Sequence, residues 1–318
     1  MIGGQSKKYN NVIMISRSRN IKKYLREYWP FYVFIAPALV VTFIFSYVPM
    51  YGLQIAFKNY SARLGIWNSE WVGLKHILRF INIYDFWPLI RNTLMISFYS
   101  ILFGFPVPII FALMINEINS SKYKRFVQMA SYAPYFISVV ALVGLINLFF
   151  KRETGIVNLL LSILGREGHN FLTDSSWFRR LYVGSGIWQS AGWGTIIYLA
   201  VLSQVDAESV EAAVIDGATR LQKIRYINLP ALFPIISIQL ILTAGSLMNV
   251  GFEKVFLMQN NLNKETSSVI ATYIYDLGII GGEFSYTTAI GFFNSLINAL
   301  MLVTVNTIAK KLNAASLW

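Results

Sequence analysis

The sequence predicts an all-α polytopic membrane protein, on the evidence of its composition and of the length of its apolar segments. Hydrophobic residues make up 55% of the 318 residues and charged residues only 13%, and the mean hydropathy is +0.52. A soluble domain carries about 25% charged residues, so this chain is too apolar to be one. A helix that crosses the hydrocarbon needs about 20 predominantly apolar residues. We therefore predict six transmembrane helices, near residues 31–56, 92–116, 126–150, 181–203, 231–258 and 286–309.

Residues 1–30 are predicted to form a basic segment on the cytoplasmic side of the membrane. They contain seven lysines and arginines, and a positive bias before the first span commonly sets the orientation of a membrane protein. The apolar segment 31–56 that follows has full membrane length, so we expect a first transmembrane helix and not a cleavable signal peptide. The simplest role for the basic residues is an electrostatic anchor to anionic lipid headgroups.

The rest of the chain is predicted to comprise an extracytoplasmic loop, a core of five transmembrane helices and a short cytoplasmic tail. The loop covers residues 57–91, the core residues 92–310 and the tail residues 311–318. With six spans and an inner N-terminus, the C-terminus also lies in the cytoplasm. In a second outer loop, residues 155–164 form an apolar run that we expect to be a short helix along the membrane surface.

A polar stretch separates the fourth and fifth predicted spans, and its first half predicts a capped helix. Asp206 is expected to be the N-cap, and Glu208 and Glu211 place negative charge in the first turn, where the exposed N–H groups and the helix dipole favour it. Gly217 is expected to end this helix. The polar stretch lies on the cytoplasmic side in the predicted topology.

The second half of the stretch predicts another short helix. Thr219 and Gln222 have the spacing of a capping box. Pro230 is expected to end the helix, because the residue before a proline avoids helical geometry. Small alanines leave one surface of the stretch with little bulk, and an apolar stripe at three-residue spacing is formed by Leu221, Ile224 and Ile227. This combination favours an element that enters a cleft of a partner protein, although alanines chosen for helix propensity in an ordinary loop are the alternative.

The same stretch resembles the EAA loop of the membrane subunits of binding-protein-dependent ABC importers. The resemblance lies in Glu211-Ala212-Ala213, Asp216-Gly217-Ala218 and Ile227-Asn228-Leu229-Pro230. It implies the type I ABC importer permease architecture and a loop, residues 206–230, that receives force from an ATPase; we call residues 206–230 the coupling loop. The residues implied in ATPase coupling are Glu211, Ala212, Ala213, Asp216, Gly217, Ala218, Ile227, Leu229 and Pro230.

These coupling residues have separate expected roles. Glu211 would make a charge-assisted contact with a basic residue of the ATPase. Gly217 would allow the sharp turn, because glycine adopts backbone angles that other residues avoid. The alanines would allow the two proteins to approach closely.

Other segments resemble the carbohydrate-uptake branch of these permeases, and in particular the importers of alginate or aldouronate fragments. The matching segments are Phe86-Trp87 before Asn92-Thr93-Leu94, Gly155-Ile156-Val157-Asn158 before Phe171-Leu172-Thr173-Asp174, and Asn249-Val250-Gly251-Phe252-Glu253. The resemblance implies a second, different permease subunit, two ATP-binding-cassette subunits, an extracytoplasmic solute-binding protein and an oligosaccharide substrate that could be acidic. It also implies residence among the lipids of the bacterial cytoplasmic (inner) membrane.

Several classes of site are absent from the sequence. It has no Gly-x-x-x-x-Gly-Lys-Ser/Thr phosphate loop, so ATP and Mg²⁺ are expected to bind to the partner ATPases and no cofactor to this chain. It has no cysteine and only two histidines, which argues against a metal site. We find no hydrolase or dinucleotide motif and expect no catalytic residue. The basic residues are dispersed, so nucleic acid is not an expected partner despite a net charge of +12.

A sugar path needs amide groups and flat aromatic faces with little charge. The candidates in the fourth and fifth predicted spans are Asn249, Gln189, Trp188, Trp193 and Tyr198. Packing of polar residues between helices is the preferred explanation for any single one of them. Glu253 could contact the solute, and a surface position near the end of a span is the alternative for it.

Two other functions remain open on the sequence. The first is a self-sufficient facilitator or secondary carrier in which the cytoplasmic loop is only structural; the scarcity of charged residues in the spans argues against ion coupling, but not against a facilitator. The second is a membrane-embedded enzyme, for which the spans contain no paired carboxylates or metal ligands.

Overall fold

The computed structural model describes residues 21–312 and 314–318 and divides the chain into two compact units that meet between Gln54 and Ile55. In the first unit, helix α1 (Ile21–Thr42) runs into a π turn, Phe43–Tyr47, and then into a 3-10 segment, Val48–Phe57, which leads into the second unit. The apolar side chains of this helical stretch are exposed, Phe34 to 90%. An exposed apolar helix of this length confirms the helix predicted over residues 31–56.

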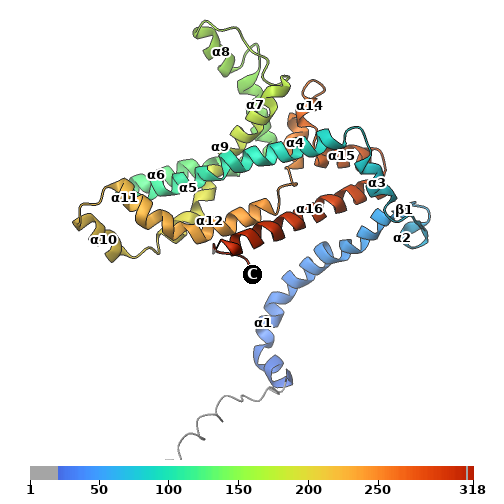
Figure 1. Cartoon of the computed structure of the whole chain (residues 1–318), viewed down its shortest axis with the longest axis horizontal. Coiled ribbons are helices and arrows are strands. Elements are labelled where there is room, and N and C mark those ends of the chain that lie inside the picture. Colours follow the sequence, from blue (N-terminus) through green and yellow to red (C-terminus); the bar gives the residue numbers. More distant parts are fainter. Residues whose placement is uncertain (1–20, 313) are drawn as a thin grey trace, which may run out of the picture. The chain divides into compact units, whose positions relative to one another are not determined.

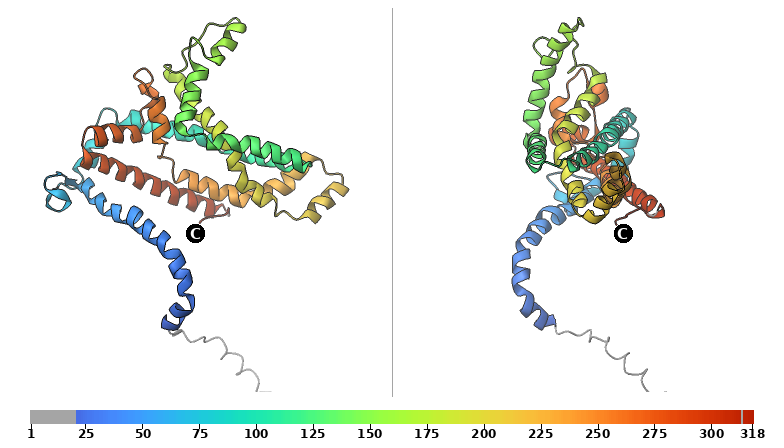
Figure 2. Two further views of the ribbon diagram at one scale, coloured as in Figure 1. Left: turned by 180° about the vertical axis from the view of Figure 1, so that it is seen from behind. Right: turned by 90° about the vertical axis from the view of Figure 1, so that its left-hand side faces the viewer.

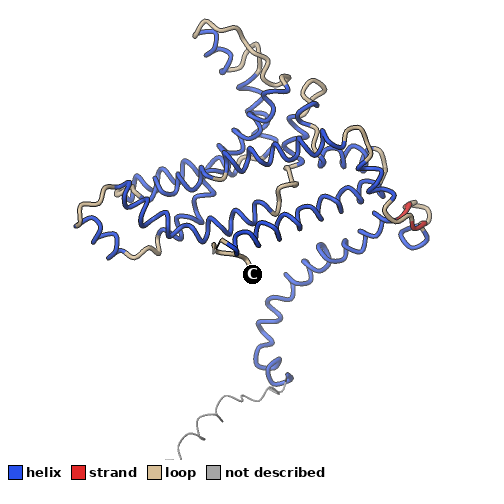
Figure 3. Tube along the Cα trace, viewed as in Figure 1, coloured by secondary structure: helices blue, strands red, loops and turns tan. Residues whose placement is uncertain are grey.

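The second unit consists almost entirely of helices, as Figure 1 and Figure 3 show. Its one small sheet pairs β1 (Lys58–Asn59) with β2 (Glu70–Trp71) in antiparallel fashion. Its helices are α2 (Gly65–Asn68), α3 (Lys75–Ile81), α4 (Phe86–Tyr99), α5 (Pro106–Asn116), α6 (Ser121–Tyr132), α7 (Val139–Phe150), α8 (Ile156–Ile163), α9 (Ser175–Leu202), α10 (Ala207–Ile215), α11 (Arg220–Lys223), α12 (Leu229–Ala244), α13 (Phe252–Met258), α14 (Lys264–Ser267), α15 (Ile270–Tyr275) and α16 (Phe284–Lys311).

Four helices in the described part of the chain are long and apolar enough to cross a membrane. They are Arg26–Phe57, Phe86–Asn116, Arg220–Ala244 and Phe284–Lys311, and a bent pair of helices raises the number to five if it counts as one span. Helix α9 is 28 residues long, but serines, glycines and Gln189 dilute its apolar residues. The predicted count of six spans therefore stays a prediction.

The third predicted span is not one straight helix. Ser121–Phe136 and Val139–Phe150 meet at an angle of 97°. The cause is local, because Pro134 lies in a 3-10 turn and the hydroxyl of Ser138 accepts a hydrogen bond from the N–H of Ala141, 3.2 Å away, which caps a new helix. A continuous helix over residues 126–150 was therefore a wrong prediction.

The fifth predicted helix, 231–258, is also wrong in its second half. Helix α12 ends at Ala244, and a short separate helix, α13, begins at Phe252. Between them, Oδ1 of Asn249 accepts hydrogen bonds from the side-chain amides of Asn294, at 3.1 Å, and Asn298, at 3.0 Å, both in α16. A polar side chain that bonds to a neighbouring helix holds this segment in a non-helical path.

Three of the prolines inside the long helices follow a π turn. Three such turns, Phe43–Tyr47, Ser100–Gly104 and Ile224–Asn228, each lie two residues before a proline, at Pro49, Pro106 and Pro230. A proline ring clashes with the carbonyl four residues earlier in a regular helix, and the wider π turn relieves that clash. This allows α4 to continue through Ser100–Gly104 into α5.

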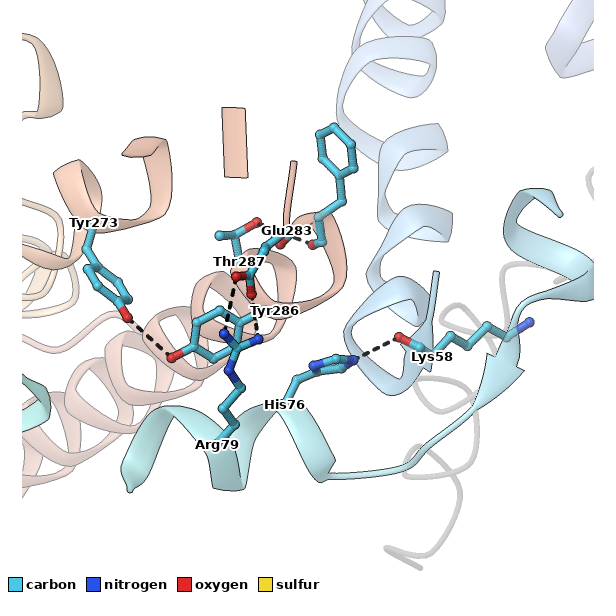
Figure 4. A network of polar contacts seen from close by, with 8 residues as sticks. Lys58, His76, Arg79, Tyr273, Glu283, Tyr286 and Thr287 are labelled. Carbon is cyan, nitrogen blue, oxygen red and sulfur yellow. Dashed lines mark hydrogen bonds and ion pairs between the residues drawn. The ribbon is translucent and has the colours of Figure 1, made fainter. Parts of the chain in front are cut away.

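The predicted outer loop 57–91 is structured and is attached to the beginning of α16. Its last residues belong to α4, which begins at Phe86. The guanidinium of Arg79 in α3 pairs with Glu283 and lies 4.0 Å from the ring centroid of Tyr286, which is buried (Figure 4). Nε2 of His76 lies 3.1 Å from the carbonyl oxygen of Lys58, and the dashed line between them in the same figure marks this hydrogen bond. These contacts fix α3 and β1 to each other and to α16.

Figures 1 and 2 show that α10 and α11 project from one end of the second unit, whereas β1, β2 and α3 lie at its other end. The coupling loop is joined to the core by an apolar cluster between α5, α9 and α12. The buried members of this cluster are Ile109, Ala112, Leu113, Tyr198, Leu202 and Leu232. Ile224 and Leu229 of the coupling loop pack against it. The loop therefore stands on a packed base.

Candidate functional site

The first helix of the coupling loop is capped as the sequence predicts. The carboxylate of Asp206 accepts hydrogen bonds from the N–H groups of Glu208 and Ser209, at 3.3 and 3.1 Å, and from the hydroxyl of Ser209, at 2.7 Å. These bonds lower the pKa of Asp206, with the Ser209 hydroxyl as the main cause. Only Glu208 lies in the first turn of α10. The expectation that Glu211 also lies there is wrong, because Glu211 is one turn further along.

Gly217 makes the sharp turn after α10 through a left-handed backbone conformation. Its φ angle is +79°. The N–H of Ala218 bonds to the carbonyl of Ala213 at 2.9 Å, and the N–H of Gly217 bonds to that of Val214 at 3.1 Å. This is the Schellman arrangement, which satisfies the last carbonyls of a helix and favours glycine at this position. The predicted helix stop is confirmed.

The second helix begins as predicted but does not end as predicted. Thr219 and Gln222 form the capping box, in which the Gln222 side chain accepts from the N–H of Thr219 at 2.7 Å. The helix then passes through the π turn and Pro230 into α12, and Leu229 has helical angles of φ −67° and ψ −43°. Pro230 therefore starts α12 and does not end the preceding helix, since the π turn removes the clash that a proline causes in a regular helix.

The outer surface of the coupling loop carries exposed apolar side chains. The side chains of Val214, Ile215, Leu221 and Tyr226 are exposed to 54, 85, 77 and 69%. Glu211, Asp216 and Gly217 lie on the same protruding element and are also exposed. Exposed apolar side chains on a projecting element are typical of a surface that binds another protein.

A carboxylate that the sequence analysis missed anchors the coupling loop to the core. Glu117, which caps the C-terminal end of α5, has one oxygen 3.4 Å from Nζ of Lys223 and the other 3.5 Å from Nδ2 of Asn228. The ion pair is partly buried, with side-chain exposures of 16% for Glu117 and 18% for Lys223. A Glu more than 100 residues before its partners gives no signal in the sequence pattern.

Two of the candidate path residues line one cavity. Trp193 and Tyr198 border a cavity of about 540 Å³ between α5, α9 and α12. Trp193 also stacks on Tyr135, with ring centroids 4.6 Å apart and ring planes within 5°. Gln189 donates a 2.7 Å hydrogen bond to the carbonyl of Ile137. Trp193 and Gln189 thus hold the bend between α6 and α7, which is a packing role.

The other candidate path residues lie elsewhere. Trp188 borders a separate cavity of about 420 Å³ between α7 and α9. Asn249 is bonded to Asn294 and Asn298 of α16, and Glu253 is exposed on α13. The structure does not gather the six predicted residues into one site.

Comparison with known proteins identifies the family. The sequence model of one protein family, described as binding-protein-dependent transport system inner membrane component, matches residues 104–314. This range includes the whole coupling loop. The chain belongs to this family.

Known permeases resemble this one along nearly the whole chain. Protein LplB of Bacillus subtilis is 43% identical over 92% of this permease and 92% of that protein. The polygalacturonan/rhamnogalacturonan transport system permease protein YteP, also of Bacillus subtilis, is 40% identical over 95% of this permease and 94% of that protein.

Solved structures show the same fold. A chain of a bacterial ABC transporter involved in the import of the acidic polysaccharide alginate is 38% identical, covers 92% of this permease and 98% of that chain, and superposes with a TM-score of 0.83. A second structure, of the alginate ABC transporter in complex with an alginate pentasaccharide-bound periplasmic protein, gives a TM-score of 0.84 over 93% of this permease and 99% of that chain. This permease therefore has the type I ABC importer permease fold, and it is a transport subunit of a family of inner membrane components.

Proposed function

We propose that the permease forms part of the translocation path of an ATP-driven importer for an oligosaccharide, and that the coupling loop transmits the movement of partner ATPases to it. The coupling loop is the observation that carries this proposal. It projects from the core and exposes Ile215 and Leu221. It also continues without a helix end into α12. An element with these three properties can bind a partner and pass a displacement to the transmembrane core.

In the proposed assembly, this chain pairs with a second, different permease, two ATP-binding-cassette subunits and an extracytoplasmic solute-binding protein. The ATPases would bind ATP and Mg²⁺, because this sequence has no phosphate loop of its own. Glu211 would contact a basic residue of an ATPase, and the small residues Ala212, Ala213 and Ala218 would let the two surfaces approach closely.

An oligosaccharide is the proposed cargo because one similar permease and the similar solved transporters have polysaccharides in their names. YteP is described as a polygalacturonan/rhamnogalacturonan permease, and the solved transporters import alginate. All three polymers contain acidic sugars, so an acidic oligosaccharide is the proposed substrate class. The proposed orientation places the coupling loop and both termini in the cytoplasm of a bacterium.

Reconstitution tests the proposal directly. The permease is assembled with its partner permease, ATPases and binding protein in proteoliposomes, and uptake of labelled uronate oligosaccharide is measured with and without internal ATP. We expect uptake only with ATP. Transport by the purified permease alone, without any ATPase, would show that it is a facilitator and would refute the proposal.

A further inference from the structure

A third cavity carries positive charge at the side of α9 that faces α4. It has a volume of about 510 Å³ and lies between α9 and the helix formed by α4 and its π turn. Its lining includes Tyr99, Phe103, Ser176, Arg179, Arg180 and Gly184. Sequence analysis assigned no role to any of these residues.

The two guanidinium groups at this cavity are available to an anion. One Nη of Arg179 donates a 2.7 Å hydrogen bond to Oδ1 of Asn92, which is a neutral acceptor. Its Nε is buried without a hydrogen-bond partner. Arg180 lies 4.8 Å from the ring centroid of Trp177 and is exposed. Within the described residues, neither arginine forms an ion pair with a carboxylate.

A buried donor without a partner is costly, and a cluster of unneutralised cations more so. The geometry of a guanidinium matches a carboxylate, which it binds through two parallel hydrogen bonds. A carboxylate in the cavity would therefore offset the two positive charges.

The cavity is polar at one end and aromatic at the other. Arg179 and Arg180 lie in the second turn of α9, whereas Tyr99 and Phe103 lie about halfway along the helix Phe86–Asn116. Flat aromatic faces suit the apolar face of a sugar ring. Arg180 and Gly184 also border the cavity of Trp188, so the two cavities adjoin along α9.

We propose that this cavity binds a carboxylate-bearing sugar residue, with Arg179 and Arg180 at the carboxylate and Tyr99 and Phe103 beside the ring. This inference rests on the proposed function, in which the substrate is an oligosaccharide, and it assigns the residues that would recognise the acidic group. In the proposed orientation the arginines lie at the extracytoplasmic end of α9, where a released substrate arrives.

Binding to the importer complex without its binding protein tests the site. The complex is placed in nanodiscs of zwitterionic lipid, and calorimetry compares trigalacturonate and trimannuronate with their carboxyl-reduced, neutral counterparts. We expect at least one acidic trisaccharide to bind more tightly than its neutral counterpart. Arg180→Gln should weaken that binding about tenfold, and Arg180→Lys less, because a lysine keeps the charge and loses the two-pronged geometry.

Arg166→Gln is the matched control, because it removes one positive charge from an exposed outer residue that does not line the cavity. It should leave binding unchanged. Equal affinity for acidic and neutral sugars, equal loss in both variants, or no binding of either acidic sugar would overturn the inference. Native mass spectrometry of the Arg180→Gln complex is a further check. If this variant has lost a bound anionic lipid and nothing else, the inference is overturned.

Uptake by the wild-type importer, measured in parallel, separates this inference from the proposed function. Absence of ATP-driven uptake of any oligosaccharide would refute the function. If both acidic and neutral sugars are taken up with ATP, and Arg180→Gln does not change the ratio of acidic to neutral sugar taken up, only the proposed site is refuted.

Discussion

The carboxylate of Glu117 lies 3.4 Å from Nζ of Lys223, so an ion pair joins the end of α5 to the helix of the coupling loop. The same carboxylate reaches Asn228, which is buried in the π turn that leads to α12. A charged group that is only 16% exposed loses much of its hydration, and its partners therefore matter more than those of a surface ion pair. Glu117 is in a position to hold the coupling loop at a fixed angle to α5.

We expect Glu117→Gln to weaken coupling between ATP hydrolysis and transport, because the loop would no longer be held by an ion pair. The ratio of solute transported to ATP hydrolysed should fall several-fold in proteoliposomes. Lys223→Gln should have a similar effect, and the double variant should be no worse than either single variant, since each change breaks the same pair. Additive effects would show that the pair does not act as a unit.

Gly217→Val should destabilise the turn of the coupling loop by about 1–2 kcal/mol, because a branched residue does not tolerate a positive φ angle. We expect transport to fall while the permease still inserts into the membrane. Gly165→Val is the matched control: Gly165 has a φ angle of +70° and equally open surroundings, but it lies in an outer loop. Equal loss of transport in both variants would assign the effect to general instability.

The cap of α10 should depend on pH through Asp206. The pKa of this carboxyl is lower in the folded loop than in the unfolded chain, so its contribution to stability is present above the unfolded value and is lost as the pH falls through the folded value. The protection of the α10 amides from hydrogen exchange, relative to their intrinsic rates at each pH, should therefore fall in acid. In Asp206→Asn, which keeps the cap without the titration, the acid-induced loss of protection should be smaller. An unchanged pH profile in that variant would contradict the assignment.

The outer loop should lose stability in mild acid through His76. Burial lowers the pKa of this imidazole below its usual value, and its Nδ1 is buried without a partner. The folded loop thus binds a proton less readily than the unfolded loop, and stability decreases as the pH falls below about 6.5. Hydrogen exchange over residues 58–81 should show this acid sensitivity, and His76→Gln should remove it. Persistence in the variant would point to another group.

Local chemistry could be predicted from the sequence, and contacts across the fold could not. Asp206, Gly217 and Thr219 act through neighbours at most five residues away, so their caps and turn follow from residue type and spacing. The bend at Ser138 was missed because six spans of similar length were fitted to an apolar pattern that continues across it. The path of the chain through Pro230 depends on a π turn, which has no sequence signature of its own.

For the candidate path residues, too, the contacts across the fold could not be predicted from the sequence. Trp193 and Gln189 have the side chains expected of a sugar path, but their partners, Tyr135 and Ile137, belong to a bend that the sequence did not predict. Arg179 and Arg180 were passed over because they lie at the edge of a span, where a basic residue is commonplace. Only the contacts of these two arginines in the structure show that they are available to an anion.

The unbroken helix from Arg220 to Ala244 has a mechanical consequence. At 1.5 Å per residue its 25 residues form a lever roughly 37 Å long. One arm projects among the exposed side chains of the coupling loop, and the other ends five residues before Asn249, which is tied to α16. If the whole helix tilts by about 10° about its coupling-loop end, its other end moves by roughly 6 Å. The coupling-loop end and the far end of this helix are therefore expected to move together.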